Sequence, residues 1–203
     1  MLGLLFVLTT LGCGNSTTRE APLDRDGYDL AVCDPSSNFF QDISPTSPVD
    51  YLELSGDGST QTRGTRCGGA SDVDACEAAL ARLAPPDGWA LRPDGGAPSP
   101  RSFLTFTRGD EVGVIGAADL AAFLSPADTV VDAAFLAQVA TRGSVDCSAP
   151  AGRITPDGIE IITRTDYPCG GAREEHRVLV EPSGVATVLE TALLEPGTET
   201  ICP

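Results

Sequence analysis

Lysine is absent from this chain of 203 residues, whose 13 basic side chains are all arginines against 29 aspartates and glutamates. The formal net charge is −16. Nucleic acids and anionic membrane surfaces both attract clustered positive charge, so this composition argues against either as a partner. We interpret the charge as a soluble acidic surface. A docking face for a cationic partner or for calcium is the alternative.

Other features are scarce as well. Aromatic residues make up 5% of the chain, with one histidine, one tryptophan and no methionine beyond Met1. The Gly-x-Ser-x-Gly motif that presents a nucleophilic serine is missing. Hydrophobic residues still reach 41%, which is enough for a core of ordinary size. The 22 glycines and 16 prolines predict a folded body with many loops.

The chain begins with a short apolar run, Leu2–Leu11, followed by Gly12 and Cys13. A bilayer-crossing helix takes about 20 residues, so the run is too short to span a membrane. It has the length of a signal-peptide core instead, which predicts export.

Leu11-Gly12-Cys13 resembles the lipobox of bacterial lipoproteins, in which the cysteine thiol is acylated and the peptide is cut on its N-terminal side. The resemblance covers residues 1–13 and implies a signal peptide over 1–12 and a lipid on Cys13. Stable anchoring needs more than one acyl chain, and the resemblance implies an N-terminus that carries several. We therefore expect a membrane-anchored protein in the periplasm or at the outer membrane. A secretory signal cleaved nearby, with Cys13 incidental, is the alternative.

Residues 13–27 are polar and show no apolar period, so we predict a flexible tether there. A globular domain is predicted over 28–203. Within it, residues 85–100 are rich in proline, glycine and aspartate, which indicates a long loop or a joint between subdomains.

The chain has seven cysteines, and a lipid on Cys13 leaves an even number of them. This is typical of an exported chain with disulfide bonds. Cys67 lies in a glycine-rich turn just before a predicted helix that carries Cys76, so these two are paired first. The expected pairs, in decreasing order of support, are Cys67–Cys76, Cys147–Cys169 and Cys33–Cys202.

Metal sites are not indicated. Zinc-binding cysteines are usually separated by two to four intervening residues, whereas the nearest pair here, Cys67 and Cys76, is nine positions apart. Asp24-Arg25-Asp26-Gly27 partly matches a calcium loop, but Pro22 and Cys33 stand where ligands are required. We predict neither a metal nor a cofactor.

The hydrophobic periodicity predicts strands separated by a few helices. The expected strands cover 51–54, 61–66, 102–107, 111–116, 159–165, 175–181 and 185–190. The expected helices cover 71–84 and 118–124, with a third from Ser125 to a stop at Arg142 and Gly143. Ser71 and Ser125 are the expected N-caps. The resulting fold class is α+β, an antiparallel sheet with two or three helices, stapled by disulfides.

Three features could carry chemistry or binding. His176, the sole histidine, falls on the apolar side of a predicted strand, where a structural role is expected. Trp89 could stack a ligand, although covering a core edge is favoured. Phe39-Phe40 could mark a partner surface or be buried. The carboxylate pairs are too common to single out one as a site: Asp24/Asp26, Asp72/Asp74 and Glu174/Glu175.

The sequence leaves several functions open. The favoured hypothesis is an envelope-anchored lipoprotein that acts as a non-enzymatic binding or structural module. The alternatives are a secreted hydrolase with a site at His176 or at carboxylates, and an inhibitor or adhesin presenting a loop at 85–100 or 101–112. The second loop contains Arg108-Gly109-Asp110, the integrin tripeptide, although Gly-Asp is also ordinary turn chemistry.

Overall fold

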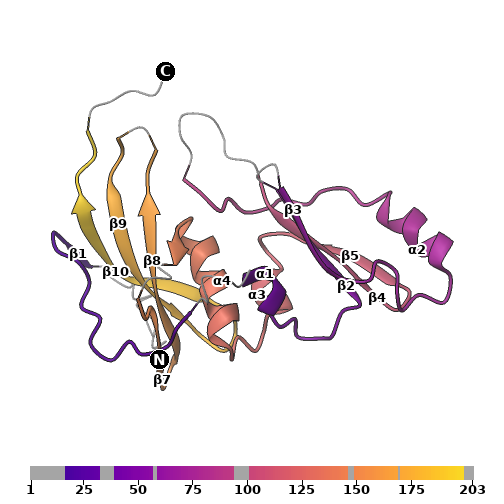
Figure 1. The fold of residues 1–203 in the computed structure, drawn as a ribbon, viewed down its shortest axis with the longest axis horizontal. Coiled ribbons are helices and arrows are strands. Elements are labelled where there is room, and N and C mark those ends of the chain that lie inside the picture. Colours follow the sequence, from indigo (N-terminus) through magenta and orange to yellow (C-terminus); the bar gives the residue numbers. More distant parts are fainter. Residues whose placement is uncertain are drawn as a thin grey trace, which may run out of the picture.

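The computed structural model describes residues 17–32, 39–56, 59–93, 101–145, 149–168 and 170–198. Two sheets lie on either side of a central helix (Figure 1). Within these ranges, all strand pairs are antiparallel except one at the N-terminal edge of the larger sheet. The chain therefore has the α+β class that the sequence predicts, with two sheets in place of one.

The larger sheet, which we call sheet A, has the strand order β1-β10-β9-β8-β6, with β7 also paired to β8. Its strands are β1 (Thr17–Arg19), β6 (Ser144–Val145), β7 (Gly152–Thr155), β8 (Gly158–Asp166), β9 (Arg173–Val180) and β10 (Ala186–Glu195). β8, β9 and β10 are the three strands expected in the last third of the chain. β10 continues beyond the expected end at residue 190 through two register shifts.

The smaller sheet, sheet B, has the order β3-β2-β4-β5 and consists of two hairpins. Its strands are β2 (Tyr51–Gly56), β3 (Ser59–Gly64), β4 (Phe103–Arg108) and β5 (Glu111–Ile115). The four strands expected in this part of the chain are confirmed, although β3 begins at Ser59 and ends at Gly64. Leu52, Leu54, Leu104 and Phe106 are buried at the core, because alternate residues of these strands point to the same face.

Four helices are present in the described part of the chain: α1 (Phe39–Asp42), α2 (Val73–Leu80), α3 (Leu120–Phe123) and α4 (Val130–Thr141). The N-caps differ from those expected. Asp72, not Ser71, accepts from the Ala75 amide at the start of α2. Thr129, not Ser125, caps α4, because its extended backbone lets the side chain accept from the Asp132 amide.

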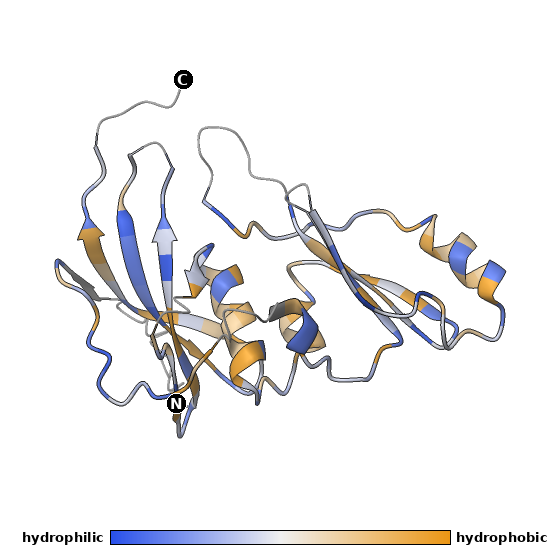
Figure 2. Ribbon diagram, viewed as in Figure 1, coloured by the Kyte–Doolittle hydropathy of each residue, from blue (hydrophilic) through white to orange (hydrophobic). Residues whose placement is uncertain are grey.

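Helix α4 lies between the two sheets and joins their cores. Its apolar side chains are spread around the helix rather than along one stripe, and the run from Asp132 to Ala137 is buried, as expected for a helix that is covered on most sides. Phe135 of α4 meets Trp89 edge-to-face, with ring centroids 6.1 Å apart. In Figure 2, hydrophobic residues gather where α4 separates the sheets. The buried residues of both sheets and α4 form one hydrophobic cluster.

The segment before the core lies against the outer face of sheet A. Residues 17–27 were expected to be a tether, but β1 pairs with β10 and Leu23 is 4% exposed. The buried carboxylate of Glu175 holds this segment, accepting from the Leu23 amide (3.1 Å) and from the Arg25 guanidinium (2.9 Å). The partners of this contact are far apart in sequence, so no local pattern indicates it.

A second contact holds the same segment a few residues further on. The Tyr28 hydroxyl donates to Glu160 Oε2 (2.7 Å), and Arg153 pairs with the same carboxylate (2.8 Å) while lying over the Tyr28 ring. Burial and the hydrogen bond to Glu160 raise the pKa of the Tyr28 hydroxyl, so this group stays a donor. Sheet A is thus covered on one face by α4 and on the other by the N-terminal segment.

Candidate functional site

A cleft of about 560 Å³ lies between the edge of sheet A and sheet B. Small-molecule sites typically measure about 300–1,000 Å³, so the cleft is large enough for a metabolite-sized ligand. One wall comes from the end of α4 and from strands β6 and β8, and the other from β2, β3 and the segment around Leu91. The site therefore depends on how the two sheets are joined.

The wall on the sheet A side is shaped by the end of α4. Arg142, the C-cap residue, has a left-handed backbone (φ 53°, ψ 30°) that turns the chain toward β6. Gly143 follows it in tight contact with β8. A Cβ atom at Gly143 would lie 2.7 Å from the carbonyl oxygen of Arg164, so only glycine fits there. Arg142, Gly143, Ser144 and Arg164 consequently line the cleft together.

The wall on the sheet B side comes from the first hairpin. Gln61 and Leu54 are cross-strand partners that share the inner face, and both line the cleft with Ser59. Gly56 (φ 140°) packs so closely on Ser102 that a Cβ atom would lie 2.5 Å from its hydroxyl oxygen. This hairpin end is held against Ser102, which forms a backbone bridge with Trp89.

Charged residues of both signs line the cleft. Within the part of the chain that the structure describes, they are Arg92, Arg142, Arg164 and Asp166. Asp166 pairs with Arg173 at 2.6 Å. The Glu175 carboxylate that pairs with Arg164 (3.2 Å) also pairs with Arg25 (2.9 Å), so two guanidiniums meet one carboxylate. Among the described residues, three arginines and one aspartate therefore line the cleft, and Arg164 and Asp166 are engaged in ion pairs within the protein.

A smaller groove of about 180 Å³ runs between α2 and the outer face of sheet B. Glu53 lies in it and accepts from the Tyr51 hydroxyl (2.6 Å) and the Ser55 hydroxyl (2.7 Å). Burial and the hydrogen bond to Glu53 raise the pKa of Tyr51 to about 12. Both oxygens of the carboxylate are already engaged within the protein, so the groove offers a weaker site than the cleft.

His176 is built into the interior of sheet A. It is 7% exposed, and its Nδ1 and Nε2 lie 3.1 Å from the hydroxyls of Thr191 and Thr165. Burial lowers the pKa of the imidazole, against a smaller opposing effect of Glu174. His176 does not line the cleft, and both ring nitrogens contact threonines. The arrangement is that of a structural histidine.

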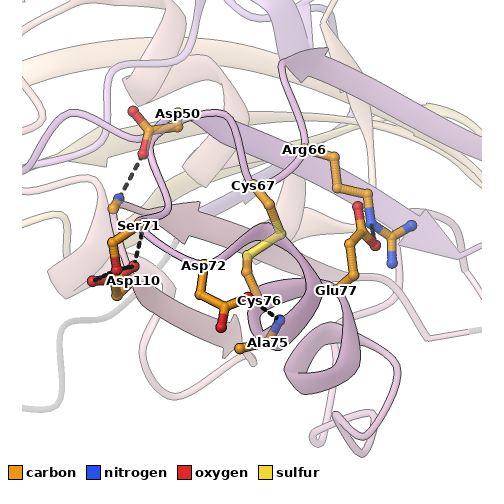
Figure 3. The surroundings of a disulfide bond; sticks show 10 residues. Asp50, Arg66, Cys67, Ser71, Asp72, Ala75, Cys76, Glu77 and Asp110 are labelled. Atoms are coloured by element: carbon orange, nitrogen blue, oxygen red, sulfur yellow. Dashed lines mark hydrogen bonds and ion pairs between the residues drawn. A yellow bond between two sulfur atoms is a disulfide. The ribbon is translucent and has the colours of Figure 1, made fainter.

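The Cys67–Cys76 disulfide is present, with 5.9 Å between the Cα atoms (Figure 3). Cys76 faces inward from α2 and packs with Leu80, as its helical position predicts. The pairs Cys147–Cys169 and Cys33–Cys202 lie outside the described residues, as does Cys13. They remain predictions.

The tripeptide Arg108-Gly109-Asp110 lies at the tip of the second hairpin of sheet B, and its charged ends are engaged within the protein. Arg108 pairs with Glu111 (2.7 Å). Asp110 accepts from the amide (2.6 Å) and hydroxyl (2.9 Å) of Ser71, and these bonds lower the pKa of its carboxyl (Figure 3). The hairpin tip thus holds the loop before α2, which accounts for the acidic residue without an adhesive role.

The remaining candidates have structural surroundings. Trp89 is 4% exposed in the core, and Phe40 is 1% exposed. Asp72 caps α2, and Asp24 accepts from the Asp26 amide in a turn. In the ranges that the structure describes, no group of three or more histidine, cysteine, aspartate or glutamate side chains could hold a metal ion. In the same ranges, no helix is both long and apolar enough to cross a membrane.

Comparison of the chain with protein-family profiles, curated protein sequences and solved structures finds no match. The functional argument therefore depends on the residues and geometry of the cleft. Sequence reasoning did not select this site, because its walls come from segments far apart in the chain. Two of its residues, Arg142 and Gly143, stand out in the sequence, but their pattern predicts only the end of a helix.

Proposed function

We propose that the protein is an exported, lipid-anchored binding module that takes a small ligand into the cleft between sheets A and B. The observation that carries the proposal is the cleft itself, a concave site of metabolite size with converging polar side chains. The leader that resembles a lipobox and the even number of remaining cysteines support export.

A binding role is favoured over a hydrolytic one by what surrounds the catalytic candidates. His176 contacts two threonines and lies outside the cleft. The buried carboxylates Glu160 and Glu175 are each paired with arginine and bonded to the N-terminal segment. General acid–base chemistry needs a titratable group within reach of a bound substrate, and these groups serve the fold instead. Asp166 is the carboxylate in the described lining of the cleft, and it is paired with Arg173 (2.6 Å).

Blocking the cleft tests this function. Ser59→Trp places a large side chain in the cleft from the exposed start of β3, whereas Thr60→Trp adds the same bulk on the opposite face of the strand. A library of small metabolites is screened against the full-length protein by thermal shift, and each hit is measured by calorimetry. We expect hits to bind Thr60→Trp like the wild type and Ser59→Trp at least about tenfold more weakly. Equal affinity for both variants would place the site elsewhere.

The anchor is tested separately, so that export and ligand binding can fail independently. Mass spectrometry of the native N-terminal peptide is expected to show a diacylglyceryl-type addition on Cys13. Cys13→Ser is expected to move the protein from the membrane fraction to the soluble fraction. A native protein that starts at an unmodified Met1 would contradict export.

A further inference from the structure

We propose that the protein contacts the membrane surface with the end of sheet A at which β10 begins, so that the cleft opens at the opposite end of the sheet. The inference rests on the lipid anchor of the proposed function and specifies how the anchored body is oriented. It is carried by three observations: the short link between Cys13 and β1, the direction of β1, and the exposed apolar side chains at that end of the sheet.

The link between the lipid and the folded body is short. Residues 14–16 separate Cys13 from β1, which begins at Thr17. An extended chain advances about 3.5 Å per residue, so Cys13 lies within about 14 Å of Thr17 in any conformation. The headgroup layer of one bilayer leaflet is about 5–8 Å thick and takes up much of this reach. The edge of the sheet that carries β1 is therefore held at the membrane surface.

The chain that follows β1 adds no length to this link. The Leu23 amide donates to the buried Glu175 carboxylate (3.1 Å), and a few residues further on the Tyr28 hydroxyl donates to Glu160 (2.7 Å). Hydrogen bonds to carboxylates away from water are strong, so they keep this segment on sheet A instead of releasing it as a tether. The folded body consequently moves with its anchor.

The direction of β1 selects one end of sheet A. β1 is parallel to β10, with Thr17 opposite Glu190. Going back four residues from Glu190 leads to Ala186, the first residue of β10. Going back four residues from Thr17 leads to Cys13, whose furthest reach is therefore level with the start of β10. A lipid on Cys13 brings this end of the sheet to the headgroups.

The same end of sheet A carries exposed apolar side chains. Five large hydrophobic side chains are exposed in the described ranges, and three of them are Val185 (49%), Leu189 (37%) and Ile154 (74%). Val185 directly precedes β10, and Leu189 lies in its first half. Ile154 of β7 is at this end as well, because the register aligns it through β8 and β9 with Ala186. Apolar side chains of this kind gain free energy when they leave water for the membrane interface.

The charge at this end determines the kind of lipid. Asp157 and Glu181, in the turns beside β7 and β10, are exposed and acidic. They are repelled by anionic headgroups, as is a body with a net charge of −16. The contact is therefore made with zwitterionic headgroups, and it depends on the anchor and on apolar side chains.

The cleft lies at the other end of sheet A. β8 begins at Gly158, which pairs with Thr155 beside Ile154, and it ends at Asp166, which lines the cleft. A strand rises about 3.3 Å per residue, so the 9 residues of β8 place the cleft roughly 25 Å from the membrane end. In Figure 1, β7 lies at one end of the sheet and the arrowhead of β8 at the other. The cleft thus opens to solutes of the aqueous compartment.

Fluorescence quenching in vesicles of phosphatidylcholine with brominated acyl chains tests the orientation. The full-length lipidated Val185→Trp is compared with Val73→Trp, the same substitution at a similarly exposed side chain (53%) in α2, far from sheet A (Figure 1). Trp89 is 4% exposed and gives the same background in both variants. We expect Val185→Trp to lose about half of its emission or more and Val73→Trp to lose little, because bromine quenches an indole only at the membrane. Equal quenching of the two variants would overturn the inference.

A longer link tests whether the short one holds the body in place. About twenty glycine and serine residues inserted between Ser16 and Thr17 form a coil with an end-to-end distance of about 25 Å, and they leave β1 unchanged. We expect the quenching of Val185→Trp to fall to the level of Val73→Trp. Quenching that the insertion leaves unchanged would overturn the short link as the cause of the orientation.

The inference and the proposed function fail in different ways. Mass spectrometry that finds no lipid on Cys13 would overturn both the anchor and the orientation. A lipid on Cys13 together with unquenched Val185→Trp would overturn the orientation alone and leave the anchored binding module standing. Quenching of Val185→Trp that persists in the Cys13→Ser background would overturn the anchor as its cause.

Discussion

Glu175 and Leu23, 152 residues apart in the chain, are joined by a hydrogen bond of 3.1 Å from the Leu23 amide to the buried carboxylate. The same carboxylate accepts from the guanidiniums of Arg25 and Arg164. Its side chain is 3% exposed, so these bonds form largely away from water, where charge-assisted bonds are strong. Glu175 therefore ties the N-terminal segment to two strands of sheet A, one of which contributes to the cleft.

Glu175→Gln is expected to lower the free energy of unfolding by about 2–4 kcal/mol. Glutamine has the same size as glutamate, but it has no charge to strengthen the bonds from the two guanidiniums. Its NH₂ group would also face one of the present donors, so that one hydrogen bond is lost. Urea unfolding at pH 7, followed by circular dichroism, gives the change. The control is Glu111→Gln, which removes an exposed pair with Arg108 and should cost less than about 1 kcal/mol. Similar losses of free energy for both variants would show that the bonds of Glu175 stabilise the fold no more than an exposed ion pair does.

The Cys67–Cys76 disulfide is expected to stabilise one end of sheet B in particular. It closes a loop with a sequence separation of 9, for which chain entropy gives about 2–3 kcal/mol. Replacing both cysteines by alanine should therefore speed hydrogen exchange in α2, measured by mass spectrometry. Exchange in β8 and β9 serves as the internal control and should change much less, because these strands belong to the other sheet. Uniform acceleration across both sheets would contradict a local role.

Strands with a period of two were the most predictable from the sequence. β2, β4, β5 and β8 to β10 contain alternating apolar and polar residues, which is the signature of a half-buried strand, whereas β3 has no apolar residue. β7 has four residues, and its Ile154 is 74% exposed, so burial leaves no pattern there. The docking of residues 20–32 depends on Glu160 and Glu175, which are far away in the chain.

The cleft was less predictable than the fold because it belongs to no single element. Arg142 and Gly143 have the ordinary sequence of a helix end, and Gln61 has that of an edge strand. Their common site arises only when α4 is placed between two sheets. The sequence pattern indicated one sheet, and a single sheet has no such gap. His176, by contrast, was assigned correctly to the interior, since strand alternation alone places it on the buried face.

Asp132 is a buried acid at the start of α4 and provides the next prediction. It is 0% exposed, accepts from the Ser44 amide (2.7 Å) and bonds the Thr129 hydroxyl. Asp132→Ala leaves the Ser44 amide without its acceptor and should lower the free energy of unfolding by about 2–3 kcal/mol. Asp132→Asn retains an acceptor oxygen and should cost less than half of this. Urea unfolding of both variants at pH 7 measures the difference, and equal costs would contradict the bond to Ser44.

The pH dependence gives a further test of Asp132. Burial raises the pKa of this carboxyl above its unfolded value of 3.8. Between the two pKa values the native state binds more protons, so stability rises as the pH falls. Wild-type protein should therefore gain stability relative to Asp132→Asn as the pH is lowered from 7 toward 4. A constant difference across this range would show that the carboxyl titrates as it does in the unfolded chain.

The hydrogen bonds around His176 define its protonation. The Thr165 hydroxyl donates to the carbonyl oxygen of Thr141 (3.2 Å), so its oxygen is left to accept from His176 Nε2. Nδ1 then accepts from the Thr191 hydroxyl (3.1 Å). A neutral imidazole protonated on Nε2 satisfies every one of these bonds. A second proton on Nδ1 would point at the hydrogen of the Thr191 hydroxyl, so this hydroxyl would have to rotate before its oxygen could accept.

His176 should consequently make the protein less stable in mild acid. Burial lowers the pKa of the folded imidazole below 6.5, whereas the unfolded chain keeps about that value. The unfolded state therefore binds more protons below pH 6.5, and the free energy of unfolding falls as the pH is lowered through it. Between pH 7.5 and 5.5 the wild type should lose up to about 1.4 kcal/mol more than His176→Gln, measured by urea unfolding. Because the chain has one histidine, its ring proton resonance reports the folded pKa directly, and a midpoint at or above 6.5 would contradict the buried neutral state.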